Sequence, residues 1–105
     1  MMDLSAYQTI YMEEARKRLM ELQRQLAHLE SGTIEPEGIE AAQRAAHSLK
    51  GDSATMGYDE LAGLAYAIEV PLKRAMQQGD PLPADFAATL RATLDRFQET
   101  LAAMS

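Results

Sequence analysis

Apolar side chains recur every three or four residues along four segments of this 105-residue sequence, and no segment alternates apolar and polar residues. That spacing matches one turn of an α-helix, whereas a half-buried strand would repeat every two residues. The sequence therefore predicts four amphipathic helices and no sheet. Because the connections are short, successive helices should run antiparallel. We predict an all-α fold, an antiparallel up-down four-helix bundle.

The first predicted helix runs from about Leu4 to Glu30, with Asp3 or Ser5 capping its start and Ser31-Gly32 ending it. Its apolar seam consists of Met12, Ala15, Leu19, Leu22, Leu26 and Leu29. The second predicted helix begins near Pro36 and fades near Met56-Gly57. Its inward side gathers Ile39, Ala42, Ala46, Leu49 and Ser53.

The third predicted helix begins with Asp59 as its N-cap and ends at Gln78-Gly79. Pro71 lies inside it, and because proline removes a backbone donor, we predict a kink or a break there. The buried stripe of this helix should be Leu61, Leu64, Ile68, Leu72 and Met76. The fourth predicted helix follows Pro81-Leu82-Pro83, and its stripe should be Phe86, Leu90, Leu94, Phe97, Leu101 and Met104.

Composition limits what such a chain can do. Its length suits one domain over residues 1–105, and cysteine is absent, which excludes disulfides, thiolate metal sites and cysteine nucleophiles. The net charge of −6 argues against nucleic acid, since phosphate binding needs a basic surface. No apolar run approaches the length that spans a membrane, and no signal segment opens the sequence. We expect a cytoplasmic protein that binds neither nucleic acid nor membrane.

One of the two histidines points away from the predicted core. On a helical wheel His47 lies about 130° from the centre of the inward side of the second helix. Lys50 and Gly51 follow one turn along, while Gln43 and Arg44 lie on the same wet face before it. The other histidine, His28, lies opposite the seam of the first helix, and we interpret it as a solvated surface residue.

An exposed imidazole flanked in this way is suited to covalent chemistry at a ring nitrogen. A neutral imidazole can act as a nucleophile, and Lys50 could neutralise a phosphoryl group that it accepts. Glycine in a helix interior costs about 0.5–1 kcal/mol relative to alanine, so Gly51 suggests that another molecule approaches closely. The simpler alternative is a surface histidine beside a tolerated glycine.

The tight turn predicted at Gly57-Tyr58 places residues equally far from it at the same height in the hairpin. His47 is eleven positions before Tyr58 and Glu69 is eleven after it. We therefore predict that the Glu69 carboxylate accepts a hydrogen bond from His47 Nδ1, which would leave Nε2 unprotonated and outward. Lys50 and Tyr66 are level by the same count. The alternative is that Glu69 pairs only with Lys73 on its own helix.

These residues resemble a known family. The run His47-Ser48-Leu49-Lys50-Gly51, continuing through 54–58 to Leu61, Leu64, Ala65 and Glu69, resembles the histidine-containing phosphotransfer (HPt) domain, specifically the N-terminal phosphotransfer domain of chemotaxis histidine kinases of the CheA type. The resemblance is strongest over residues 44–69 and weaker over residues 7–30.

The resemblance implies roles for individual residues. His47 would be the phosphoacceptor, modified at Nε2, Lys50 would contact the phosphoryl group, and Glu69 would hold the other ring nitrogen. Gly51 would give clearance to partners, and we expect the partner surface to include Gln43, Arg44 and Tyr66. The sequence departs from the family where Tyr66 replaces a common second histidine, at Asp52 and at Pro71.

The resemblance also implies partners. The phosphoryl group would come from ATP on a histidine kinase domain, in cis or in trans, and pass to an aspartate of a CheY- or CheB-like receiver domain. We expect no cofactor, no metal site and no catalysis of ATP hydrolysis by this chain. If the chain is part of a CheA, the parent is a histidine protein kinase, and the isolated domain is expected to be a monomer.

Three alternatives differ in their requirements. A stand-alone relay protein would use the same histidine. A helical interaction domain without covalent chemistry would tolerate replacement of His47. A metal-binding bundle usually needs Glu-x-x-His pairs, whereas Arg44 and Gln25 stand three residues before the two histidines.

Overall fold

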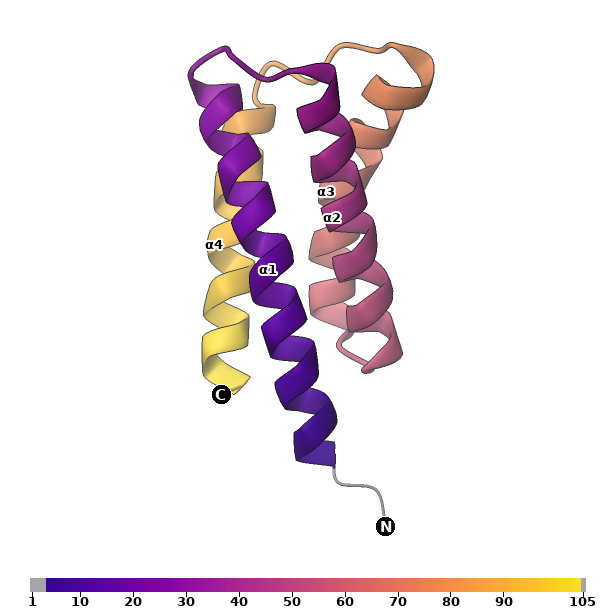
Figure 1. Cartoon of the computed structure of the whole chain (residues 1–105), viewed down its shortest axis with the longest axis vertical. Helices are drawn as coiled ribbons and strands as arrows, with labels where there is room; N and C mark the ends of the chain where they lie inside the picture. Colours follow the sequence, from indigo (N-terminus) through magenta and orange to yellow (C-terminus); the bar gives the residue numbers. More distant parts are fainter. Residues whose placement is uncertain (1–3, 105) are drawn as a thin grey trace.

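The structure is a computed structural model that describes residues 4–104. Four helices follow one another: α1 (Leu4–Glu30), α2 (Pro36–Thr55), α3 (Asp59–Gln78) and α4 (Phe86–Met104), and no strand occurs within the described residues. They run alternately up and down the long axis, with α1 beside both α2 and α4 and with α3 beside α2 and α4 (Figure 1). The predicted all-α, up-down four-helix bundle is confirmed.

Most helices begin and end close to the residues predicted from the sequence. Gly32, Gly57 and Gly79 each adopt a positive φ of 71–77° just beyond a helix, a conformation that only glycine reaches without strain. Pro36 is the first residue of α2, as expected. Asp59 is wrong as the N-cap, because it is already the first residue of α3 and Tyr58 occupies the cap position. Ser5 lies inside the first turn of α1, and Asp3 lies outside the described residues.

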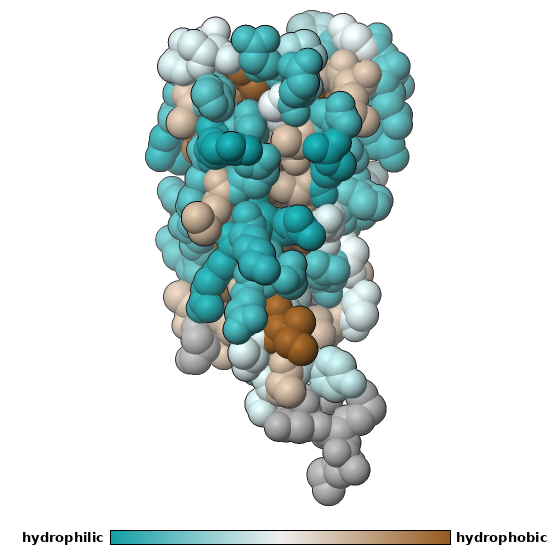
Figure 2. All heavy atoms as spheres, viewed as in Figure 1, coloured by the Kyte–Doolittle hydropathy of each residue, from teal (hydrophilic) through white to brown (hydrophobic). Residues whose placement is uncertain are grey.

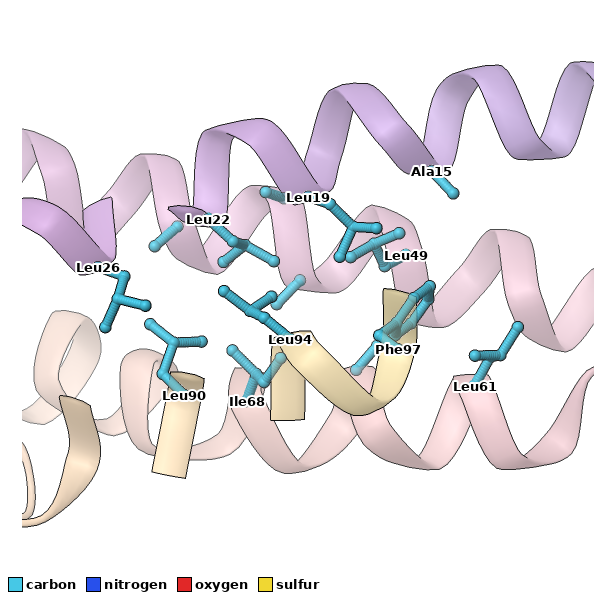
Figure 3. Packing of buried hydrophobic residues seen from close by; sticks show 14 of the residues in the cluster. Ala15, Leu19, Leu22, Leu26, Leu49, Leu61, Ile68, Leu90, Leu94 and Phe97 are labelled. Atoms are coloured by element: carbon cyan, nitrogen blue, oxygen red, sulfur yellow. The ribbon is translucent and has the colours of Figure 1, made fainter. Parts of the chain in front are cut away.

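The core fills the space between the four helices. Figure 3 shows side chains from all of them converging on the same interior. The large apolar side chains that are almost completely buried include Leu22, Leu49, Leu61, Leu72, Leu90, Leu94 and Phe97. Burying one such side chain stabilises the fold by about 1.5–3 kcal/mol. The predicted core members Leu29, Ile39, Leu64 and Met104 are only half-buried.

Met76 is wrongly predicted as a core residue, because it is 41% exposed near the end of α3. Small side chains instead line the contact between α2 and α3, where Ala45, Ala46 and Ala65 are buried. These alanines let the two helices approach closely, and no other pair of helices packs over as many residues. The close hairpin is what brings polar groups of α2 and α3 together across its outer edge.

Pro71 does not break α3. The helix is continuous from Asp59 to Gln78, although proline cannot donate a backbone hydrogen bond to the carbonyl of Ala67. Ile68 and Leu72 on either side are 2% and 0% exposed, so tertiary packing holds the chain in the helix on both sides of the lost bond. The predicted break is therefore wrong, because packing overrides the local preference.

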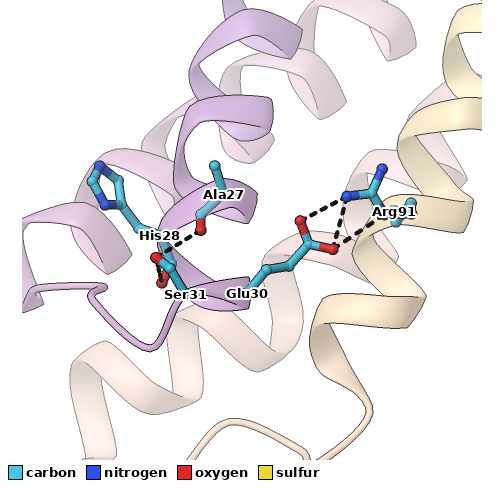
Figure 4. Close-up of polar contacts among 5 residues, drawn as sticks. All are labelled: Ala27, His28, Glu30, Ser31 and Arg91. Carbon is cyan, nitrogen blue, oxygen red and sulfur yellow. Dashed lines mark hydrogen bonds and ion pairs between the residues drawn. The ribbon is translucent and has the colours of Figure 1, made fainter.

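Polar contacts stabilise the C-terminal end of α1 and link it to α4 (Figure 4). Arg91 of α4 donates through Nη2 to both oxygens of Glu30, at 2.6 and 2.7 Å. The Ser31 hydroxyl donates to the carbonyl of Ala27, which satisfies one of the free carbonyls of the last turn. His28 points away from this ion pair and is exposed, with Nδ1 3.0 Å from the Thr33 hydroxyl.

The face seen in Figure 2 is largely hydrophilic, with a small apolar area towards its lower end. The large exposed apolar side chains of the whole molecule include Tyr7, Ile10 and Met20 of α1. Within residues 4–104, no helix is both long enough and apolar enough to cross a membrane.

One buried hydrogen bond joins α1 to α2 beneath the surface. Tyr11 is 5% exposed, and its hydroxyl lies 2.7 Å from the hydroxyl of Ser53, which is completely buried. Burial raises the pKa of Tyr11, because the phenolate would lose its hydration, although the bond to Ser53 opposes this rise. The ring of Tyr58 packs edge-on against Tyr11, with centroids 5.0 Å apart.

We predict that Tyr11→Phe lowers the free energy of unfolding by about 1–2 kcal/mol, because it leaves the buried Ser53 hydroxyl without its partner. Tyr58→Phe is the matched control: it keeps the ring contact and removes a hydroxyl that bonds to no group within residues 4–104, so the loss should stay below about 0.5 kcal/mol. Urea unfolding followed by circular dichroism measures both. Equal losses would show that the Tyr11 hydroxyl contributes nothing specific.

Candidate functional site around His47

His47 lies on the outer side of α2, near the start of the half of the helix that leads to the Gly57 turn. Its side chain is 63% exposed, as the apolar periodicity of α2 predicted. Across the hairpin, the side chain that meets it is Glu69 of α3, with His47 Nδ1 2.6 Å from Glu69 Oε2. The predicted contact between these two residues is present.

Glu69 is the most buried charged group of the site, with only 3% of its side chain exposed. Three donors converge on its two carboxylate oxygens. Lys50 donates to Oε1 at 2.6 Å, while His47 Nδ1 and the Gln43 amide both reach Oε2, at 2.6 and 3.0 Å. All three donors come from α2, so the carboxylate joins α3 to one face of α2.

This set of donors keeps Glu69 ionised. Burial alone would raise its pKa, because a carboxylate loses hydration between the helices. The hydrogen bonds from Lys50 and His47, together with the positive charge of Lys50, outweigh that effect and hold the pKa of Glu69 below its ordinary value. At neutral pH the group is therefore a carboxylate.

An ionised carboxylate can only accept hydrogen bonds, so His47 Nδ1 must carry the proton in their contact. In the neutral ring the other nitrogen, Nε2, then holds a free lone pair. Because Nδ1 faces the buried carboxylate, this lone pair is directed away from Glu69 on a side chain that is 63% exposed. The geometry thus provides a fixed nucleophilic nitrogen that another protein can reach.

Lys50 is half-buried and already engaged. Its ammonium bonds to Glu69 Oε1 and lies 5.5 Å from the centroid of the Tyr66 ring, a cation–π distance. The sequence placed Lys50 and Tyr66 at the same height in the hairpin, and their contact confirms that prediction.

The remaining predicted residues lie around this cluster. Gly51 faces open space, because a Cβ placed there would meet no atom within 4 Å. Arg44 is exposed and pairs with Glu40 on its own helix, so the structure does not bring it into the cluster. Glu69 forms its bonds with α2, and the alternative pairing with Lys73 is not among its contacts within residues 4–104.

Sequence reasoning missed two features. It placed Gln43 in a partner surface, whereas the amide is bonded to Glu69; its position four residues before His47, on the same helix face, was the available signal. It also missed a groove beside Lys50 and Tyr66 that Lys73 and Arg74 line. The spacing of positions 66, 70, 73 and 77 along one side of α3 would have indicated it.

The sequence matches a domain family and parts of chemotaxis proteins. Residues 6–100 match the family model of the Hpt domain. Chemotaxis protein CheA of Bacillus subtilis (strain 168) is 34% identical over 98 residues, which are 92% of this chain and 14% of that protein. Chemotaxis protein CheA of Rhizobium meliloti (strain 1021) is 35% identical over 68% of this chain and 9% of that protein. The chain therefore spans a small part of the length of these relatives.

A solved structure is similar over almost the whole chain. The CheA phosphotransferase domain from Thermotoga maritima superposes with a TM-score of 0.84 and 27% sequence identity, covering 94% of each chain. The fold, the exposed histidine with its buried carboxylate, and the family match agree. We conclude that the chain belongs to the Hpt domain family.

Proposed function

We propose that this chain is a phosphotransfer module in which His47 accepts a phosphoryl group derived from ATP and passes it to an aspartate of a response regulator. The observation that carries the proposal is an exposed imidazole whose Nδ1 bonds to a buried carboxylate, so that Nε2 is free. Membership of the Hpt family supports it.

The chemistry requires little from the chain itself. The lone pair of His47 Nε2 attacks the terminal phosphorus of ATP on a kinase domain, an N–P bond forms, and the bond to the ADP oxygen breaks. The ring then carries positive charge, which the Glu69 carboxylate stabilises through Nδ1–H. In the second transfer an aspartate oxygen attacks phosphorus, and the electrons of the N–P bond return to Nε2.

Lys50 has a second role in this proposal. Once Nε2 bears a phosphoryl group, the new anion competes with Glu69 for the ammonium, which sits one turn away on the same helix. Gln43 would keep its bond to Glu69 Oε2 while Lys50 turns, so the carboxylate would stay aligned with the ring. Gly51 would leave room for the partner protein above this face.

The relatives support a place in chemotaxis. We infer that residues 1–105 form one domain that works in the cytoplasm as the phosphotransfer part of a CheA-like kinase, as a monomer when isolated. Its partners would be an ATP-binding histidine kinase domain and a CheY- or CheB-like receiver. A stand-alone relay protein is the alternative, and it would use the same site.

We predict that His47→Gln abolishes labelling, because within residues 4–104 no other imidazole bonds to a buried carboxylate. The test incubates the chain with acetyl phosphate and with a CheA kinase domain, and follows intact mass. His28→Gln is the matched control, since His28 is the only other histidine and bonds to Thr33. An acid-labile phosphate that persists in folded His47→Gln would contradict the proposal.

We predict that Glu69→Gln slows labelling by acetyl phosphate about tenfold, because an amide does not stabilise positive charge on the ring as a carboxylate does. Glu60→Gln is the control, because Glu60 is also on α3 but pairs with Arg96 of α4. Circular dichroism checks that helix content is unchanged. Labelling of Glu69→Gln at the rate of the control would remove Glu69 from the mechanism.

We predict that stability falls in acid partly through Glu69. Because its pKa is lower in the folded chain than the ordinary 4.5, its ionisation stabilises the fold fully above that value and loses this effect as the pH falls through the lowered pKa. The difference in unfolding free energy between wild type and Glu69→Gln should therefore shrink in acid. A constant difference from neutral pH to below the folded pKa would be inconsistent with this linkage.

A further inference from the structure

Most cations of this acidic chain are paired with carboxylates. Among the ten lysines and arginines, only Arg16, Lys73 and Arg74 have no carboxylate within 4.0 Å in the part of the chain that the structure describes. Arg16 stands alone on α1, whereas Lys73 and Arg74 are adjacent on α3. Two unpaired cations in one place are unexpected in a chain with sixteen acidic residues and a net charge of −6.

These two cations line a groove that adjoins the His47 cluster. The groove has a volume of about 210 Å³ and runs along α3 from Tyr66 to Gln78. Lys50 and Glu69, which both belong to the His47 network, form part of its wall. Tyr66 is 56% exposed at one end, and the glutamine amides of Gln77 and Gln78 lie at the other.

The charge of the groove is positive. Lys50 and Glu69 neutralise each other at 2.6 Å, so the positive charges of Lys73 and Arg74 remain uncompensated. Both side chains are exposed and can therefore reach groups on another molecule. A groove of this kind is complementary to ionised carboxylates on a protein surface.

We propose that the groove of Tyr66, Lys73, Arg74 and Gln77 docks the acidic face of the receiver that takes the phosphoryl group from His47. This inference rests on the proposed function. The acceptor aspartate must be ionised to attack phosphorus, and the phosphoryl group on His47 is also anionic, so the two repel each other as they approach. Lys73 and Arg74 lie about one turn beyond Glu69 on α3. From there they offset that repulsion without occupying the space over His47 Nε2.

In the test, wild type and variants are first phosphorylated by acetyl phosphate to the same extent. Differences in their rates of phosphorylation therefore do not affect the measured rates of transfer. The probe is a receiver domain encoded in the same genome as this chain. Among those receivers, we choose the one to which the phosphorylated wild-type chain transfers its phosphoryl group fastest. Transfer is followed by rapid quench, as kcat/KM, from low to high salt. The variants are Arg74→Gln and Lys73→Gln/Arg74→Gln, and Arg16→Gln is the control with the same loss of charge at a distant unpaired arginine.

At low salt we expect Arg74→Gln to lower kcat/KM about threefold and the double variant about tenfold, with Arg16→Gln within about twofold of wild type. At high salt the rates should converge, because exposed charges are then screened. Circular dichroism confirms folding of each variant.

Other results would assign the groove differently. Normal transfer by the double variant at every salt concentration would overturn the proposal while leaving the proposed function intact. Slower labelling by a CheA kinase domain with unchanged transfer would assign the groove to the kinase instead. Dimers of wild type at low salt that the double variant lacks would assign it to a second copy of the chain. If no receiver accepts phosphate from labelled His47, the proposed function and this inference both fail.

Discussion

A carboxylate sealed between two helices must be compensated, and Glu69 is compensated entirely by α2. Removing an ionised group from water costs several kcal/mol unless donors replace its hydration. Lys50, Gln43 and His47 supply those donors on both oxygens. The need to satisfy one buried charge therefore fixes three side chains at once, and one of them is an imidazole that would otherwise rotate freely in water.

The bundle provides the conditions for this arrangement. The left-handed Gly57 makes a turn short enough to place Glu69 at the height of His47, and buried alanines bring α2 and α3 close enough for contact. The apolar stripe of α2 faces inward and so leaves the imidazole on the outside. The candidate site lies on the outer edge of the α2–α3 hairpin, while α1 and α4 complete the core behind it.

Much of this was predictable because it depends on local periodicity and spacing. The exposure of His47 follows from the stripe of α2, and the contact with Glu69 follows from counting outward from the turn. The bond from Gln43 to Glu69 was not predicted, because periodicity gives a residue's face but not which of its neighbours it bonds. The break at Pro71 did not occur because tertiary packing at Ile68 and Leu72 holds the helix together. Met76 was not buried because α3 extends beyond Leu72, its last buried residue. Lys73 and Arg74 stood out only once the ion pairs of the other cations were known.

The central claim is that the Glu69 carboxylate keeps the proton of His47 on Nδ1 and leaves Nε2 open. Two-bond ¹H–¹⁵N correlation spectra of the ¹⁵N-enriched, unphosphorylated wild-type chain, recorded at a pH where the ring is neutral, report the protonation of each ring nitrogen directly. The account predicts the shift of a protonated nitrogen at Nδ1 of His47 and that of an unprotonated nitrogen at Nε2. The opposite assignment, with the proton on Nε2, would contradict it.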